Sequence, residues 1–114
     1  MSMPSDLAAS APVFAALGDE TRLRIVERLG DSSPLSITAL SAGEPVSRQA
    51  ITKHLRVLEG AGLVQSSRSG REHRWELRAE RFEEARSWLD DLSRRWDERL
   101  ERLQAFVEKD PPRP

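Results

Sequence analysis

The first third of the chain has apolar residues at the spacing of two α-helices. The first helix is expected to begin near Ser10 and to end at Gly18. The second is expected over 20–29, with Asp19 as its N-cap. The apolar positions of these two segments are Val13, Phe14, Leu17, Leu23, Val26 and Leu29, with Ile25 beside them. The pattern predicts two amphipathic helices.

The middle of the chain predicts two closely spaced helices and then a β-hairpin. A short helix over 36–42 precedes the turn GEPV, and Ser47 is expected to cap the helix that follows. The apolar residues of that helix fall within one narrow arc: Ile51, Leu55 and Leu58. LVQSS and HRWEL then alternate as strands do, with Gly70 at the tip of the turn between them. Trp75 in the second strand is expected to pack the hairpin against the body.

The last third of the chain predicts one long amphipathic helix over 79–109. From Ala79 to Val107 it would be roughly 43 Å long, whereas a domain of this size is about 30 Å across. We therefore expect the helix to overhang one subunit and to hold two together, the alternative being that it folds back over its own subunit. The expected dimer contacts are Phe14, Leu17, Phe82, Leu89, Leu92, Trp96, Leu100, Leu103 and Val107.

This order of elements predicts a mainly α fold with a small β-hairpin, namely a dimeric winged helix-turn-helix. The expected organisation is a disordered lead over 1–10, a winged helix-turn-helix DNA-binding domain over 11–78, the dimerisation helix over 79–109 and a frayed tail over 110–114. The length of 114 residues suits one domain with one modest core.

Composition and charge narrow the function. The chain has no cysteine, which excludes disulfides and thiolate metal sites. It shows no secretory signal and no apolar run of membrane-spanning length, so we expect a cytoplasmic protein without a membrane partner. The net charge is −1, but the stretch 47–78 holds seven basic residues against three acidic ones. A basic middle segment favours a nucleic-acid partner.

The helix that Ser47 caps has the side chains that DNA recognition requires. The second helix of a helix-turn-helix lies in the major groove, where Gln pairs with adenine and Arg with guanine. Gln49, Lys53 and Arg56 lie opposite the apolar arc, with Thr52 at its edge; a merely solvated face is the simpler alternative. The expected DNA contacts on this helix and the hairpin are Ser47, Arg48, Gln49, Thr52, Lys53, His54, Arg56, Arg68, Arg71, His73 and Arg74. For His54, packing at the edge of the core is an equal alternative, and His73 could be a plain exposed strand residue.

Three strings carry a family resemblance. FAALGDETRLRIVERL, SRQAITKHLRVLEGAGLV and SGREHRWEL resemble, in order and spacing, the signatures of the ArsR-type winged-helix repressors. The resemblance runs from about Val13 to Leu77. It implies a homodimeric bacterial transcriptional repressor that binds a pseudo-palindromic operator in double-stranded DNA. It also implies a recognition helix over 47–56 and a wing over 68–74.

The sequence departs from the metal-sensing members of that family. Ser36 and Thr38 stand where those members carry a Cys-x-Cys motif, and the last helix has Asp90, Asp91 and Glu101 but no histidine. The resemblance therefore implies the non-metal-sensing branch, with no metal site and no cofactor. It leaves a small-molecule effector unidentified.

Two other functions stay open at this stage. A winged helix can serve protein–protein contact without binding DNA, and a steep loss of duplex binding with salt would distinguish the two. An enzyme has little support, because the paired carboxylates at 83–84 and 90–91 lie among arginines on one helix, where ion pairs explain them. Trp88 and Trp96 could line a ligand pocket, but packing between helices is the favoured interpretation.

Overall fold

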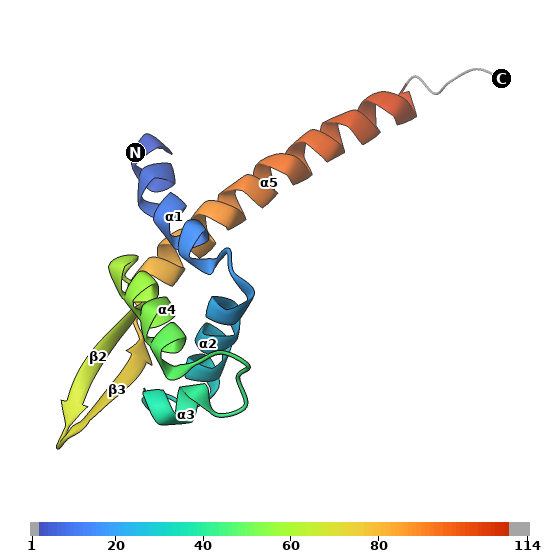
Figure 1. Cartoon of the computed structure of the whole chain (residues 1–114). Coiled ribbons are helices and arrows are strands. Elements are labelled where there is room, and N and C mark those ends of the chain that lie inside the picture. Colours follow the sequence, from blue (N-terminus) through green and yellow to red (C-terminus); the bar gives the residue numbers. More distant parts are fainter. Residues whose placement is uncertain (1–2, 110–114) are drawn as a thin grey trace.

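The structure of the protein is a computed structural model, and it describes residues 3–109. Figure 1 shows a small helical body from which a hairpin and one long helix project in different directions. In chain order the elements are α1 (Met3–Leu17), α2 (Glu20–Asp31), β1 (Leu35–Ser36), α3 (Ile37–Ser41), α4 (Arg48–Gly60), β2 (Val64–Ser69), β3 (Glu72–Leu77) and α5 (Ala79–Lys109). The mainly α architecture with a β-hairpin is confirmed.

The start of α1 differs from the prediction. The helix begins at Met3, whereas the sequence predicted disorder over 1–10 and a cap at Ser10. Ser10 instead lies inside the helix and is buried. The alanines before it favour helix, so the helix extends toward the N-terminus from the turn that packs on the core. Residues 1–2 and the predicted tail over 110–114 lie outside the described residues.

One hydrophobic core joins all the helices to the hairpin. Its buried members are Val13, Ala16, Ile25, Leu29, Leu40, Ile51, Leu55, Leu58, Leu63, Val64, Trp75 and Ala85. The expected packing of Trp75 is confirmed. Leu23 is the exception among the apolar positions predicted for the first two helices, because it is half exposed. The buried side of α2 follows Ile25 and Leu29, one turn apart, and Leu23 lies off that line.

Three side-chain oxygens fix the starts of the helices around the helix-turn-helix. Oδ2 of Asp19 accepts from the backbone N–H of Arg22 at 3.0 Å. Oγ of Ser36 accepts from the N–H of Ala39 at 3.1 Å, and Oγ of Ser47 accepts from that of Ala50 at 3.1 Å. Each bond satisfies an N–H that the first turn of a helix leaves without a partner. The caps predicted at Asp19 and Ser47 are therefore confirmed.

The hairpin belongs to a three-stranded antiparallel sheet with the order β1-β3-β2. The pairs Leu35 with Trp75 and Ser36 with Arg74 join β1 to β3. The sequence analysis did not predict β1, because two residues are too short to show an alternating pattern. Since β1 continues directly into α3, the sheet connects the wing to the helix-turn-helix.

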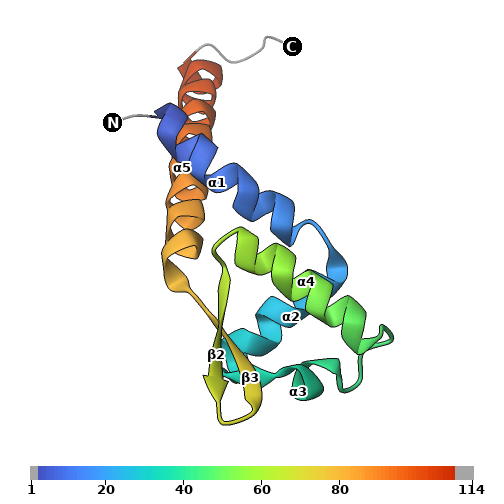
Figure 2. The same cartoon turned by 60° about the vertical axis from the view of Figure 1, so that its left-hand side comes forward.

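The long helix α5 has the predicted bounds and rises away from the body. Its 31 residues correspond to about 46 Å. Its first half packs beside α1, where the rings of Phe14 and Trp88 lie 5.6 Å apart. Figures 1 and 2 show that its second half extends beyond α1, on the side opposite the wing. No helix within residues 3–109 combines the length and the apolar character needed to cross a bilayer.

Candidate nucleic-acid interface

The N-terminal half of α4 presents the predicted reading face to solvent. Ile51, Leu55 and Leu58 bury the opposite side of the helix, which fixes its rotation about its own axis. Arg48, Gln49 and Lys53 are therefore exposed. Thr52 is half-buried, and its hydroxyl donates to the carbonyl of Arg48 at 3.0 Å. Within residues 3–109, the side chains of Arg48, Gln49 and Lys53 have no hydrogen-bond or ion-pair partner, so their donors remain available.

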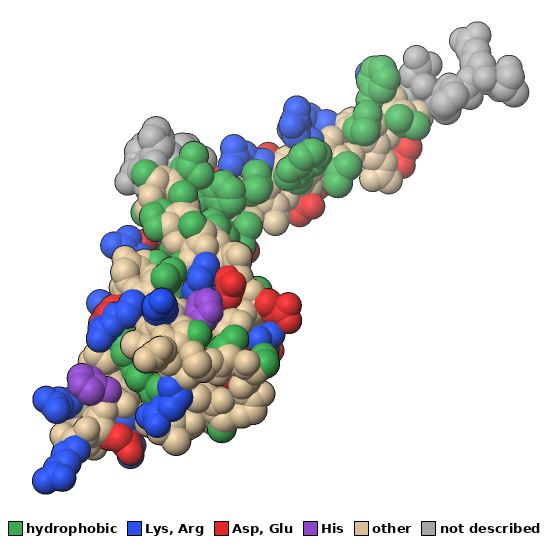
Figure 3. Space-filling view, in the orientation of Figure 1, with side chains coloured by type: hydrophobic (Ala, Val, Ile, Leu, Met, Phe, Trp, Pro, Cys, Tyr) green, Lys and Arg blue, Asp and Glu red, His purple; other side chains and the backbone are tan. Residues whose placement is uncertain are grey.

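An open groove lies between the wing, α3 and the start of α4. The residues that line it are Ser36, Ile37, Thr38, Arg48, Arg71, Glu72 and His73. Arg48 comes from α4 and Arg71 from the hairpin turn, so the fold brings two distant cations to one hollow. In Figure 3 the Lys and Arg side chains gather at the wing tip and over the helix-turn-helix.

The hairpin projects its basic residues beyond the body. Arg68 pairs with His73 across the strands, and both are exposed. Gly70 has a φ of +66°, a conformation that glycine adopts without strain at this tight turn. The exposed guanidinium of Arg74 lies 3.4 Å from Glu72, an ion pair that solvent weakens. The wing therefore presents several exposed basic side chains to solvent.

His54 lies at the edge of the core and not on the exposed face of α4. Its side chain is 21% exposed, and its Nδ1 is 3.2 Å from Nη1 of Arg22 and 3.8 Å from Oδ2 of Asp19. The backbone N–H of Arg22 holds the pKa of Asp19 below its ordinary value of 3.8, with a smaller contribution from His54. The ring therefore packs at the edge of the core, as one of the two alternatives had it, and a contact of His54 with DNA stays a prediction.

Arg56 is exposed but already engaged. Its Nη1 is 3.0 Å from Oε1 of Glu59, and its guanidinium lies over the ring of Trp75 at 5.7 Å from the centroid. The side chain therefore connects α4 to the wing through a cation–π contact. The guanidinium therefore lies toward Trp75 of the hairpin.

The sequence analysis missed the arginines of α2 that hold the helix-turn-helix. Arg28 donates to the carbonyls of Ala39, Leu40 and Ala42, at 2.5, 2.7 and 3.4 Å. Arg24 lies 3.2 Å from the carboxylate of Glu44 in the turn before α4. That carboxylate raises the pKa of Arg24. The spacing of Arg24 and Arg28, one turn apart on one helix, was the only signal in the sequence.

From Leu89 onward, α5 exposes an apolar surface that the rest of the described chain does not cover. The large exposed residues are Leu89 in the first half of the helix and Trp96, Leu100, Leu103, Phe106 and Val107 in the second half; Phe106 was not among the predicted contacts. Phe14, Leu17 and Phe82, which were predicted as dimer contacts, pack partly against the core of this chain. Figure 3 shows the apolar row along the helix.

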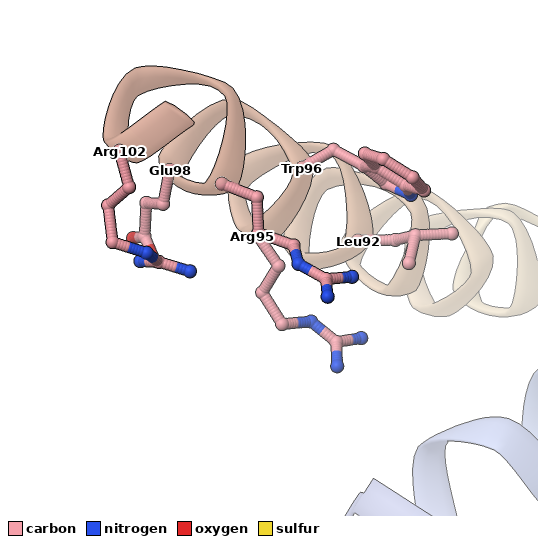
Figure 4. Close-up of a pocket in the computed structure, with 6 residues that line it drawn as sticks. Leu92, Arg95, Trp96, Glu98 and Arg102 are labelled. Carbon is pink, nitrogen blue, oxygen red and sulfur yellow. The ribbon is translucent and has the colours of Figure 1, made fainter. Parts of the chain in front are cut away.

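Arginines border this row on one side. Figure 4 shows the hollow along α5, with Leu92 and Trp96 at one end and Glu98 and Arg102 at the other. The guanidinium of Arg99 lies over the ring of Trp96 at 5.8 Å from the centroid. All the residues that line this hollow come from one helix, so within the described chain it is an open surface and not an enclosed pocket. Among all the residues that the structure describes, no three His, Cys, Asp or Glu side chains lie together in a way that could hold a metal ion.

Comparisons with known proteins agree with this geometry. A family profile described as a helix-turn-helix domain matches residues 17–66, which span α2, α3, α4 and the start of the wing. The chain is 43% identical to the uncharacterized HTH-type transcriptional regulator YuzN of Bacillus subtilis, over 52% of this chain and 71% of that protein. It is 38% identical to the HTH-type transcriptional regulator Rv2034 of Mycobacterium tuberculosis, over 76% and 78%.

A solved structure extends the similarity to nearly the whole chain. It is an ArsR-like transcriptional regulator from Rhodococcus sp. RHA1, with 39% sequence identity and a TM-score of 0.77. The alignment covers 90% of this chain and 96% of that one, so it includes most of α5 as well as the winged helix-turn-helix.

Proposed function

Since this chain belongs to the ArsR-type helix-turn-helix transcriptional regulators, we propose that it is a homodimeric repressor that binds an inverted-repeat operator. DNA binding and transcriptional regulation follow from the family. We propose three further properties: the protein is a dimer, its operator is symmetric, and its binding represses transcription. The observation that carries it is the exposed, unengaged face of α4 beside a basic wing.

We assign base reading to the start of α4 and backbone contact to the wing. Gln49 is exposed near the N-terminus of α4, and it has the paired donor and acceptor that adenine requires. Arg48 and Lys53 flank it and supply cations for guanine or for phosphates. Arg71 at the wing tip lies across the groove from Arg48 and is suited to the adjacent backbone. The side chains of His54 and Arg56 already have partners within the protomer, so we propose that they help to position α4 and do not read bases.

The exposed apolar row of α5 supports the homodimer. A lone protomer would leave five large apolar side chains of the second half of α5 in water: Trp96, Leu100, Leu103, Phe106 and Val107. A second copy offers the same row, so an isologous contact covers both surfaces at once. Such a dimer carries two copies of α4 related by a two-fold axis, and an inverted repeat in DNA has the matching symmetry.

Repression by occupancy is the simplest action for this architecture. The described residues form a DNA-reading unit and one long helix suited to self-association. A dimer seated on a promoter excludes other proteins from the same grooves. We therefore place the operator over or beside a promoter.

Selection from a pool of randomised duplexes tests the operator. The full-length protein is expected to enrich an inverted repeat whose half-sites are about 10–11 bp apart, centre to centre. In vitro transcription from a promoter that overlaps the selected site should then fall as protein is added. A pool that stays random after repeated rounds at physiological salt would overturn the operator, and unchanged or raised transcription would overturn repression.

A further inference from the structure

The three arginines of α2 each bond to a different part of the helix-turn-helix. Arg28 holds the end of α3, Arg24 holds the turn, and Arg22 holds α4. These three are the only basic residues of α2. We call them the arginine clamp.

Arg28 completes the end of α3. This helix has five residues, a length that is unstable without tertiary contacts. The last carbonyls of a helix have no hydrogen-bond partner within that helix. Here Nη1 of Arg28 donates to the carbonyl of Leu40, and Nη2 donates to the carbonyl of Ala39. A planar guanidinium can serve several carbonyls at once, and its positive charge suits a helix C-terminus.

Arg24 fixes the turn between α3 and α4. Its Nε lies 3.2 Å and 3.4 Å from the two carboxylate oxygens of Glu44, and its Nη1 lies 2.8 Å from Glu20. The side chain of Glu44 is only 7% exposed, and a buried carboxylate needs a charged partner. The backbone N–H of Glu44 also donates to the carbonyl of Ser41, at 3.1 Å. The ion pair therefore ties the turn to α2.

Arg22 connects α1 to α4. Its Nε donates to the carbonyl of Ala16 near the end of α1, and its Nη1 lies 3.2 Å from Nδ1 of His54. Asp19 caps α2 beside this contact. His54 on α4 thus lies against Arg22 of α2 and near the cap residue Asp19, and Arg22 is itself bonded to α1.

We propose that the arginine clamp positions α4 for base recognition, so that Arg22, Arg24 and Arg28 determine operator specificity without touching DNA. This inference rests on the proposed function. Specific binding needs the side chains of α4 at the base edges, whereas nonspecific binding needs only cations near phosphates. A displaced α4 therefore loses discrimination and keeps most of its nonspecific affinity.

The test compares the selected operator with a random duplex of the same length. The variants are Arg28→Gln and the double variant Arg24→Gln/Glu44→Gln, which replaces the buried ion pair by two neutral amides. Arg94→Gln is the control, because it removes the same charge from an exposed site on α5. Each protein is assayed for both affinities across a salt series, for thermal unfolding, and for amide exchange over residues 39–46.

The clamp variants are expected to lose roughly tenfold or more in the ratio of operator to random affinity, the loss typical of a mismatched base pair. Their salt slopes should equal that of the wild type, because a phosphate contact contributes about 0.9 to the slope and none is removed. Exchange over 39–46 should accelerate, while the β2–β3 amides stay protected. Arg94→Gln should leave the ratio unchanged.

Two results would overturn the inference. One is an unchanged affinity ratio in a clamp variant that remains folded at the assay temperature. The other is a salt slope that falls by about one per protomer, which would make the arginine a phosphate contact. If Arg28→Gln does not fold, Arg28→Lys replaces it, since an ammonium keeps the charge but cannot span both carbonyls. A wild type that selects no operator would refute the proposed function instead.

Discussion

Replacing two leucines of α5 by glutamine should weaken the proposed dimer, so that it dissociates at a higher protein concentration than the wild type does. In one protomer Leu100 and Leu103 are 56% and 58% exposed, so a partner can still bury about half of each side chain. Complete burial of a leucine contributes about 1.5–3 kcal/mol, and half of that is about 0.8–1.5 kcal/mol. A symmetric dimer contains four such side chains, and the double variant Leu100→Gln/Leu103→Gln therefore removes about 3–6 kcal/mol. That corresponds to a dimer Kd weakened by about 10²- to 10⁴-fold.

Sedimentation velocity over a protein concentration series measures this Kd directly. Glutamine is nearly as good a helix former as leucine, so far-UV circular dichroism should show α5 intact. Leu23→Gln is the matched control, because Leu23 is 50% exposed on α2 and lies outside the α5 row. A double variant that dimerises as tightly as the wild type would refute the assignment. So would a control that dissociates to the same extent.

Three further predictions concern DNA contacts, effectors and pH. Gln49→Ala should change the preferred base at one position of each half-site. Arg71→Ala should instead weaken binding to all duplexes and reduce the dependence of affinity on salt. Identical base preferences in the wild type and Gln49→Ala would exclude Gln49 from base reading. Zinc, cadmium or arsenite at micromolar concentration should not release the protein from its operator, because the chain has no cysteine and two histidines; stoichiometric release in a mobility-shift assay would contradict this. Asp19→Ala should lower the Tm at pH 7. The pKa of Asp19 lies below 3.8 in the folded chain, so the carboxylate stabilises the fold above that pH and its contribution is lost as the pH falls through the lowered pKa. The Tm difference should shrink in acid, and an equal difference at pH 7 and pH 3 would rule out this role.

Much of the fold could be predicted because the signals for it are local. The repeat of Ile51, Leu55 and Leu58 gives α4 and its buried side, and Ser47 gives its start. The same reasoning placed α5 and the hairpin. It failed for the start of α1, where Ser10 suits a cap but lies buried within a longer helix. A capping residue shows where a helix can begin, while packing and propensity decide where it does begin.

The parts of the site that the sequence did not predict depend on contacts between distant residues. Arg24 meets Glu44 across twenty positions, and Arg22 meets His54 across thirty-two. The periodic pattern of apolar residues in a sequence gives no information about contacts between residues that lie so far apart along the chain. The prediction for Arg56 shows the same limit, because a helical wheel places it on the solvent side but does not reveal Trp75 beside it. Charge and spacing identify which face of α4 is polar, and only the fold shows which of its side chains already have partners.

The two-residue strand β1 has a mechanical consequence. It pairs with β3 through Leu35 and Ser36, and the next residue, Ile37, begins α3. The ladder between β1 and β3 thus links the wing to the start of the helix-turn-helix, and we expect it to restrict independent motion of the wing. We therefore expect the wing to keep a nearly constant distance from α4 when the protein binds DNA. In the proposed dimer, tolerance for operators with different half-site spacing would then depend on the flexibility of the contact between the two α5 helices.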